Sequence, residues 1–291
     1  MESMRVFLLM AGLTALLVVL GGSFFGQQGA ILFFVIAAVL NFGMYWFSDR
    51  VVLKMYRARV IERADAPDLY DMVDRLRQRA NLPMPTLAIA AAEQPNAFAT
   101  GRNPEHAVVC CTAGILQLVS REELEGVLAH ELAHIKHRHM LLGTMAATMA
   151  GAIAMLGRAV MWGAILGGGG RDNEGGNPFG ALVMIIVAPI AAMIIQFAIS
   201  RQHEFQADRT AAELTGRPEG LAGALRKLDA YAHRIPMQVN PAAAQLAIVN
   251  PLSGQKGMGI MKLFSTHPPT EERIARLQAL ANDASFAALR G

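Results

Sequence analysis

Long uncharged blocks alternate with polar segments along this chain of 291 residues, and the first block is the longest. Residues 6–48 contain no charged side chain. A membrane-spanning helix needs about 20 apolar residues, so this block holds two, separated by glycine-rich runs at 21–23 and 26–29. We expect spans near 5–22 and 30–48. The length of the first span and the second span directly after it argue against a cleaved signal peptide.

Two further apolar blocks occur later in the chain. Residues 140–166 are apolar apart from Arg158, residues 180–199 are uncharged, and a polar glycine-rich loop joins them. Pro189 would kink the later helix, which membrane-spanning helices tolerate. Because Arg158 is costly in lipid unless it snorkels, pairs or faces a polar cavity, the block at 140–166 is alternatively a long buried helix of the domain that the polar segments form. Counted as a span, it brings the predicted total to four.

The polar segments show the patterns of short soluble elements. Residues 66–80 place their apolar side chains on one helical face. Residues 86–91 and 105–112 are predicted strands, and residues 96–101 are predicted to connect them. After the fourth block, helical spacing recurs at 204–215, 221–233 and 271–289.

A further helix begins after Ser120. Ser120 followed by Glu123 is typical of a capping box, which satisfies the first free N–H groups of a helix. Apolar residues at helical spacing follow, and then two histidines, His130 and His134. We expect this helix to run on into the block at 140–166, which would hold its histidines close to the membrane surface.

Composition supports a membrane protein. Hydrophobic residues make up 53% of the chain and charged residues 17%, where soluble domains carry about 25% charged residues. The net charge is only +3, and no basic face with interleaved aromatic residues is present, so nucleic acid is excluded as the expected partner.

The two cysteines, Cys110 and Cys111, are adjacent in a predicted strand. Neighbours on a strand point to opposite faces, so a disulfide between them would be strained. We interpret them as small core residues of a protein in a reducing compartment. A metal-binding pair is the less favoured alternative, because no further cysteine accompanies them.

Basic residues flank the apolar blocks asymmetrically. The loop between the first two spans has none, and the loop between the last two has only Arg171. The other ends of the spans carry the remaining flanking cations, Arg5, Arg50, Lys54, Arg57, Arg59, Lys136, Arg138, Arg201 and Arg209. The positive-inside rule therefore predicts that both termini and the polar segments 49–139 and 200–291 face the cytoplasm.

The pentapeptide His-Glu-Leu-Ala-His at 130–134 carries the most specific chemistry. Residues four apart share a helical face, so His130 and His134 can bind one zinc ion. Glu131, between them, can act as the base toward a water whose pKa zinc lowers. A helix that carries two histidines and a glutamate by chance is the alternative.

A catalytic zinc site usually has three protein ligands, and the candidates for the third are His137, His139, Glu204 and His267. His137 and His139 lie too far along a straight helix to join His130 easily on one ion, and a polar helix end is the alternative for both. Glu204 stands four residues before Asp208. One carboxylate of such a pair can bind zinc while the other accepts a hydrogen bond from a ligating histidine.

With these motifs in this order, the chain resembles the HtpX family of membrane-bound zinc metalloproteases, which is related to the CAAX prenyl proteases. The resemblance covers nearly the whole chain and rests on HELAH, EFQAD, NAFATG (96–101) and LFSTHPPTEERIARL (263–277). It implies His130, His134 and Glu204 as ligands of one zinc ion, Glu131 as general base, and Asp208 as the carboxylate behind a ligand. A departure is His139, where the family often carries Asp.

The resemblance also implies the fold: a mainly α membrane protein with four transmembrane helices and a gluzincin-like α+β catalytic domain with a small sheet. In that fold an edge strand pairs with the substrate, and Asn96, Ala97 and Phe98 would lie beside it. His267 would donate to the oxyanion, or alternatively only begin the C-terminal helix. The domains expected are 1–48 (two spans), 49–139 (catalytic), 140–199 (two spans) and 200–291 (catalytic).

The function implied is an endopeptidase of the plasma (inner) membrane that cleaves misfolded or damaged membrane proteins at the cytoplasmic face. One alternative is a CAAX-type prenyl-protein protease. Another is a zinc-binding membrane protein without proteolysis, such as a transporter with the four histidines 130, 134, 137 and 139 as a relay. A transport path needs polar groups in the spans, and only Arg158 is charged there. The pattern leaves the oligomeric state and the substrates open.

Overall fold

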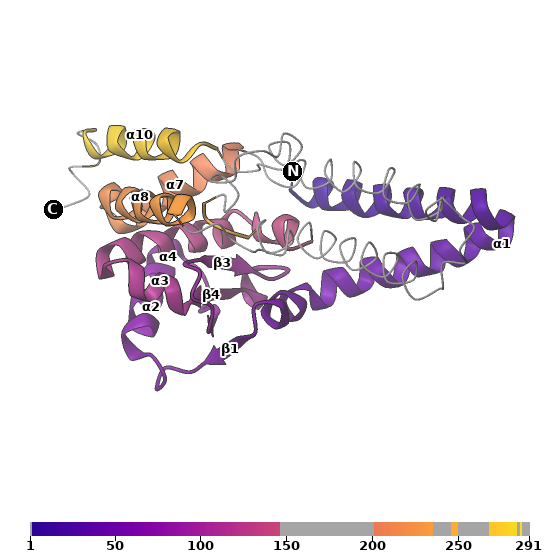
Figure 1. Cartoon of the computed structure of the whole chain (residues 1–291), viewed down its shortest axis with the longest axis horizontal. Coiled ribbons are helices and arrows are strands. Elements are labelled where there is room, and N and C mark those ends of the chain that lie inside the picture. Colours follow the sequence, from indigo (N-terminus) through magenta and orange to yellow (C-terminus); the bar gives the residue numbers. More distant parts are fainter. Residues whose placement is uncertain (1, 146–200, 235–245, 250–267, 284–285, 287–291) are drawn as a thin grey trace, which may run out of the picture.

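The structure, a computed structural model, describes residues 2–145, 201–234, 246–249, 268–283 and 286. These residues form a mainly helical molecule with one small mixed sheet. A long helical hairpin projects from one end of a body of shorter helices, and the sheet lies where the two meet (Figure 1).

Helix α1 (Glu2–Met55) forms the hairpin. Its backbone reverses at Gly26, whose φ of 65° is open to glycine without strain. The two arms contain candidate membrane spans, Val6–Ser23 and Phe25–Met55, in the places that the sequence predicts. Between the arms, the side-chain amide of Asn41 donates to Thr14 Oγ1 at 2.9 Å, which satisfies a polar group within an apolar hairpin.

The second arm is longer than predicted, and its end carries the sheet. At 1.5 Å per residue, its 31 residues span about 46 Å, whereas the hydrocarbon core of a bilayer is about 30 Å thick. Val52 near the end of this arm is fully buried against one face of the sheet, and the ring of Tyr56 lies 4.5 Å from that of Phe98. The arm therefore packs directly against the body of shorter helices and strands.

The sheet has the strand order β1-β2-β4-β3. Its strands are β1 (Ala58–Ile61), β2 (Thr86–Ala90), β3 (Ala97–Thr100) and β4 (Val108–Thr112). β2 pairs parallel with β4, while β1 and β3 are antiparallel edge strands. The prediction that residues 96–101 only connect two strands is wrong. β3 is completely buried and lacks the alternation that reveals a strand, so its sequence gives no period of two.

The strand predicted at 105–112 begins later than expected. Residues Pro104–His106 form a 3₁₀ turn (η1), which Asn103 caps, and β4 starts at Val108. On β4, Cys111 faces the helices and Cys110 faces the end of α1, and both thiols are free and buried. The expectation of two core cysteines on opposite faces is confirmed.

In the described part of the chain, the body contains six helices. They are α2 (Pro67–Ala80), α3 (Ala113–Leu118), α4 (Arg121–Lys136), α7 (Arg201–Thr215), α8 (Pro218–Arg234) and α10 (Thr270–Ala281). One hydrophobic cluster joins residues from both polar segments, from Ile61 through Leu132 to Leu225 and Leu277. The two segments therefore fold together, although more than 50 residues separate α4 from α7 in the chain.

Helix α4 begins as predicted and ends earlier. Ser120 Oγ accepts from the Glu123 N–H, and the Glu123 carboxylate accepts from the Ser120 N–H, which completes the capping box. The helix does not run on into the third apolar block: it stops at Lys136, Arg138 adopts a left-handed φ of 60°, and a new helix starts at Met140.

The new helix enters the hairpin. Leu142 and Met145 are buried against Val6 and Met44, one from each arm of α1. The remainder of the third predicted span, 146–166, and all of the fourth, 180–199, lie outside the described residues.

Candidate metal centre

The motif side chains lie on two helices packed side by side. His130, Glu131 and His134 occupy the last turns of α4, and Glu204 and Asp208 face them from the first turns of α7. All of these except the half-buried His134 are buried. α4 presents its histidines here because its opposite faces pack against α2 and α8.

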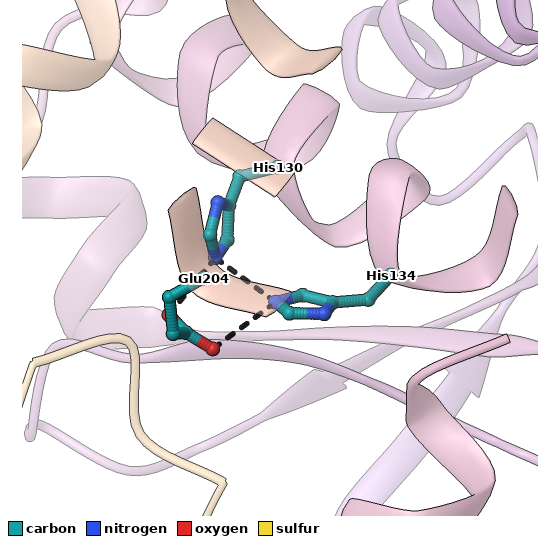
Figure 2. A group of neighbouring side chains, drawn as sticks. All are labelled: His130, His134 and Glu204. Carbon is teal, nitrogen blue, oxygen red and sulfur yellow. Dashed lines mark hydrogen bonds and ion pairs between the residues drawn. The ribbon is translucent and has the colours of Figure 1, made fainter. Parts of the chain in front are cut away.

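Three of these side chains converge on one point (Figure 2). His130 Nε2 lies 3.1 Å from His134 Nε2, and Glu204 places Oε2 3.7 Å from the first nitrogen and Oε1 3.5 Å from the second. Ligand atoms about 2 Å from a tetrahedral zinc ion lie roughly 3.3 Å from one another, so the spacing fits zinc. Two imidazole nitrogens and one carboxylate oxygen are also a zinc donor set. The group can hold a metal ion.

Asp208 and Arg273 fix which nitrogen of His130 faces that point. His130 Nδ1 lies 3.0 Å from Asp208 Oδ1, and Arg273 Nη2 lies 3.4 Å from His130 Nε2. The carboxylate of Asp208 accepts a hydrogen bond from the Nδ1–H of His130, and a guanidinium can only donate, so both contacts place the lone pair of the ring on Nε2. The lone pair of Nε2 is therefore directed at the metal position before any metal binds.

Arg273 was not predicted from the sequence to belong to this centre. It is fully buried and holds both oxygens of Asp208, through Nε at 2.9 Å and Nη2 at 2.7 Å. Burial alone would raise the pKa of Asp208, but Arg273 and His130 hold it below its ordinary value. The available signal was its position four residues before the buried Leu277, on the apolar face of α10.

Glu131 is buried beside the ligands. Burial, with a further contribution from the charge of Glu204, raises the pKa of its carboxyl to about 7 against the opposing effect of His130. The backbone N–H of Ala99 donates to this carboxylate. A carboxylate with a pKa close to neutrality is suited to take up and release a proton during a reaction.

Comparison with known proteins decides the family. The model of peptidase family M48 matches residues 63–281, which include both polar segments and the whole centre. The chain belongs to peptidase family M48. A protease HtpX homolog of Gemmatimonas aurantiaca is 58% identical over 97% of this chain and its own full length, and one of Pelotomaculum thermopropionicum is 55% identical over 97% of this chain and its own full length.

A more distant relationship appears in three dimensions. The crystal structure of Ste24p from S. mikatae matches 92% of this chain and 62% of its own length, with a TM-score of 0.50 and 16% sequence identity. At that identity the likeness shows a shared fold. The resemblance to the HtpX family is thus confirmed, and the chain is an M48 zinc metallopeptidase with membrane helices.

In this M48 peptidase a cavity of about 70 Å³ opens beside the centre. Phe98 and Ala99 of the edge strand line it on one side, and residues 246–248 line it on another. It has room for about two water molecules. Residues 246–248 were not predicted to contribute, because they match no motif.

Asn96 holds these residues in place. Its Oδ1 accepts from the Ile248 N–H at 3.2 Å, and its Nδ2 donates to the Leu246 carbonyl at 3.2 Å and to Tyr56 Oη at 3.3 Å. Arg273 donates to the Ile248 carbonyl at 2.8 Å from the other side. The side chain of Asn96 thus makes its hydrogen bonds to other residues of the protein. Ala97 and Phe98, the other two predicted substrate-binding residues, belong to strand β3.

The other candidates for the third metal ligand were His137, His139 and His267. His137 bonds to Thr210 Oγ1 and Gln206, and His139 Nδ1 lies 3.3 Å from His134 Nδ1. Neither belongs to the ligand group found in the described residues. His267 lies outside those residues, so its role stays a prediction.

Proposed function

We propose that this M48 peptidase is an endopeptidase that binds one zinc ion through His130, His134 and Glu204 and uses Glu131 as its general base. The observation that carries this proposal is the convergence of the three ligand atoms, with the buried Glu131 carboxylate on the same helix. Asp208 orients His130 from behind, as its 3.0 Å contact with Nδ1 indicates.

The metal ion, Glu131 and Ala99 have different roles in the proposed reaction. Zinc supplies a Lewis acid that polarises a carbonyl and lowers the pKa of water. Glu131 takes the proton from the attacking water and passes it to the leaving amine, a transfer that its raised pKa favours. The N–H of Ala99 orients the Glu131 carboxylate toward the cavity.

The edge of β3 that faces away from β4 is the proposed substrate site. The Asn96 carbonyl accepts from the Thr112 N–H, so alternate residues of the strand face β4. By this alternation the backbone groups of Ala97 and Ala99 face away from β4. The Ala99 N–H donates to Glu131, so an added strand would pair with Ala97 and with the Ala99 carbonyl. Phe98 would contribute its side chain beside the cavity, and Asn96 would position residues 246–248 opposite. Pairing through the backbone suits substrates of varied sequence.

Membrane proteins that are misfolded or damaged are the proposed substrates, in a quality-control or stress role. The sheet packs on the end of a candidate span, through Val52 and Tyr56, which supports a cleft near the bilayer. The flanking basic residues support a cytoplasmic location for the centre and both termini, in the plasma (inner) membrane. The shared core supports a catalytic unit built from 49–139 and 200–291, with 140–199 supplying two further spans.

Replacement of Glu131 tests the mechanism. Purified protein in detergent, supplied with zinc, should cleave casein, and Glu131→Gln should lower the rate at least about 100-fold, because general base catalysis contributes roughly 10² to 10⁴. Zinc content should be unchanged, which separates loss of the base from loss of the metal.

The same assay distinguishes the alternatives. Wild-type cleavage by Glu131→Gln would contradict the mechanism. Cleavage of a farnesylated CAAX peptide in preference to casein and to an unfolded membrane protein would favour the prenyl-protein protease over the quality-control role.

A further inference from the structure

The two histidine ligands are supported differently. A histidine that binds metal through Nε2 carries its proton on Nδ1, and that N–H needs an acceptor to fix the ring. His130 has Asp208 for this purpose. Near the Nδ1 of His134 the structure places another imidazole, with His139 Nδ1 at 3.3 Å.

We propose that His139 is a positioning residue for the metal centre: its Nδ1 accepts the hydrogen bond of the His134 Nδ1–H and so fixes the tautomer and ring orientation of that ligand. The inference rests on the proposed zinc-ligand role of His134. The two ligands then differ in their hydrogen-bond acceptors. A carboxylate, Asp208, accepts the Nδ1–H of His130, whereas a neutral imidazole, His139, accepts the Nδ1–H of His134.

The early end of α4 is what makes this contact possible. On an uninterrupted helix, residue 139 would point about 140° away from residue 134, because each residue turns about 100°. Instead, the Arg138 N–H bonds to the Ile135 carbonyl and the His139 N–H bonds to the His134 carbonyl at 2.9 Å. This is the Schellman pattern, which brings the residue after the left-handed position back over the last turn of the helix.

The left-handed residue is Arg138 rather than glycine, with φ of 60°. A side chain in that region costs roughly 1 kcal/mol or more, and such strain persists where the surrounding structure requires it. In this type of cap, the residue after the left-handed position usually makes a hydrophobic contact with a residue in the last turn of the helix. Here these two residues are His139 and His134. Both the strained turn and the contact between the two imidazoles therefore support a positioning role for His139.

Further packing holds the His139 ring. It stacks on His203, one residue before the ligand Glu204, with ring centroids 4.0 Å apart and planes 10° apart. His137 stacks at 5.5 Å with planes 22° apart. His139 as a whole residue is only 9% exposed, so water competes little for its Nδ1.

Zinc affinity in the wild type and three variants tests the proposal. The full chain, without a polyhistidine tag, is purified in detergent, and the zinc dissociation constant is measured by competition with a chelator at constant pH. His139→Phe keeps a stacking ring without an acceptor, and His139→Asn places an amide oxygen near the position of Nδ1. His137→Phe is the matched control, since His137 bonds to Thr210 and Gln206 instead.

His139→Phe should weaken zinc binding about 10- to 100-fold, the usual effect of removing a partner behind a ligand. His139→Asn should restore affinity to within about threefold, and His137→Phe should match the wild type. Metal-free thermal stability is measured in parallel, because a merely structural role would move it equally in both His139 variants. Wild-type affinity in His139→Phe, or equal losses in Phe and Asn, would overturn the proposal.

A measurement on the wild type is independent of whether variants fold. In zinc-loaded protein with ¹⁵N-labelled histidine, long-range NMR correlations should show His134 protonated at Nδ1 and bound through Nε2. A proton on Nε2 would overturn the assignment. Failure of the wild type to bind zinc would instead contradict the proposed function, whereas zinc binding that is insensitive to His139→Phe contradicts this inference alone.

Discussion

At the scale of single residues, the centre is organised by charge. Arg273 neutralises Asp208 and lies 3.3 Å from Glu204, so two buried carboxylates are tolerated where no solvent reaches them. Among the described residues, no cation is bonded to Glu131, and its raised pKa indicates that its charged form is disfavoured. The proposed general base is therefore the carboxylate whose burial costs stability.

This cost gives the metal-free protein a pH dependence. Because the pKa of Glu131 is about 7 in the folded state and near 4.5 when unfolded, the folded state binds the additional proton between these values. Its contribution is complete below pH 4.5 and is lost as the pH rises through 7. Metal-free Glu131→Gln should therefore exceed the wild type in stability by on the order of 3 kcal/mol at pH 8, and the difference should shrink toward pH 5.

Denaturant unfolding of both proteins at several pH values, with chelator present, checks this prediction. Parallel stability curves for the wild type and the variant would contradict a raised pKa at Glu131.

The residues found from sequence are those whose spacing reflects a helix. His130, Glu131 and His134 share one stretch, and Glu204 and Asp208 share another, so period and chemistry locate them together. Ala99 acts through a backbone N–H and residues 246–248 match no motif, so neither contribution leaves a chemical pattern in the sequence. His139 was predicted only as a candidate ligand or a polar helix end, because its contact with His134 depends on a strained turn. Arg273 was missed because its helix also carries several exposed charged residues, and the sequence does not distinguish it from them.

At the scale of elements, the centre depends on how closely α4 and α8 approach. A Cβ on Gly126 would lie 2.5 Å from the Leu221 nitrogen, and one on Gly220 would lie 2.7 Å from the Glu122 carbonyl oxygen. The two backbones therefore touch at glycines, one turn before His130. Such an approach positions α4 against α8 more tightly than side-chain packing would permit.

Gly126→Ala should push these helices apart. The expected loss is about 1–3 kcal/mol of stability, the usual cost of overpacking, with weaker zinc binding because His130 follows one turn later. Gly43→Ala is the matched control, since nothing lies within 4 Å of its added Cβ. Thermal unfolding in detergent compares the two, and an equally stable Gly126→Ala would show that the contact does not constrain the helices.

Element predictions succeeded where amphipathic patterns are complete. The helices α2, α7 and α8 and strand β2 lie close to their predicted positions. The edge strands β1 and β3 were missed, since four residues with no burial alternation carry too little pattern. The end of α4 was missed because a left-handed Arg138 contradicts local preference and is imposed by tertiary contacts.

At the scale of the whole molecule, the centre is a junction of distant segments. Arg273 on α10 bonds to Asp208 on α7 and to the Ile248 carbonyl beside the cavity, while Asn96 joins that same segment to Tyr56 at the end of the membrane hairpin. Metal ligands, cleft and candidate span are thus connected through two buried polar side chains. Sequence patterns cannot reveal such connections, because each depends on residues far apart in the chain.

Arg273→Met tests this junction. It leaves Asp208 and Glu204 without their cation, so the metal-free protein should lose about 3–5 kcal/mol of stability. The zinc-loaded protein should lose less, because a bound divalent cation offsets the charge of Glu204. Melting temperatures with chelator and with zinc check this, and equal losses in both states would contradict a charge-balancing role.

The most direct measurement is the zinc content of protein purified without chelators, for the wild type, Glu204→Ala and Glu213→Ala. Glu213 lies on the same helix but is exposed and paired with Arg209, which makes it the matched control. The wild type and Glu213→Ala should contain about one zinc ion per chain, and Glu204→Ala should have lost it. Full zinc content in Glu204→Ala, or none in the wild type, would contradict the proposed centre.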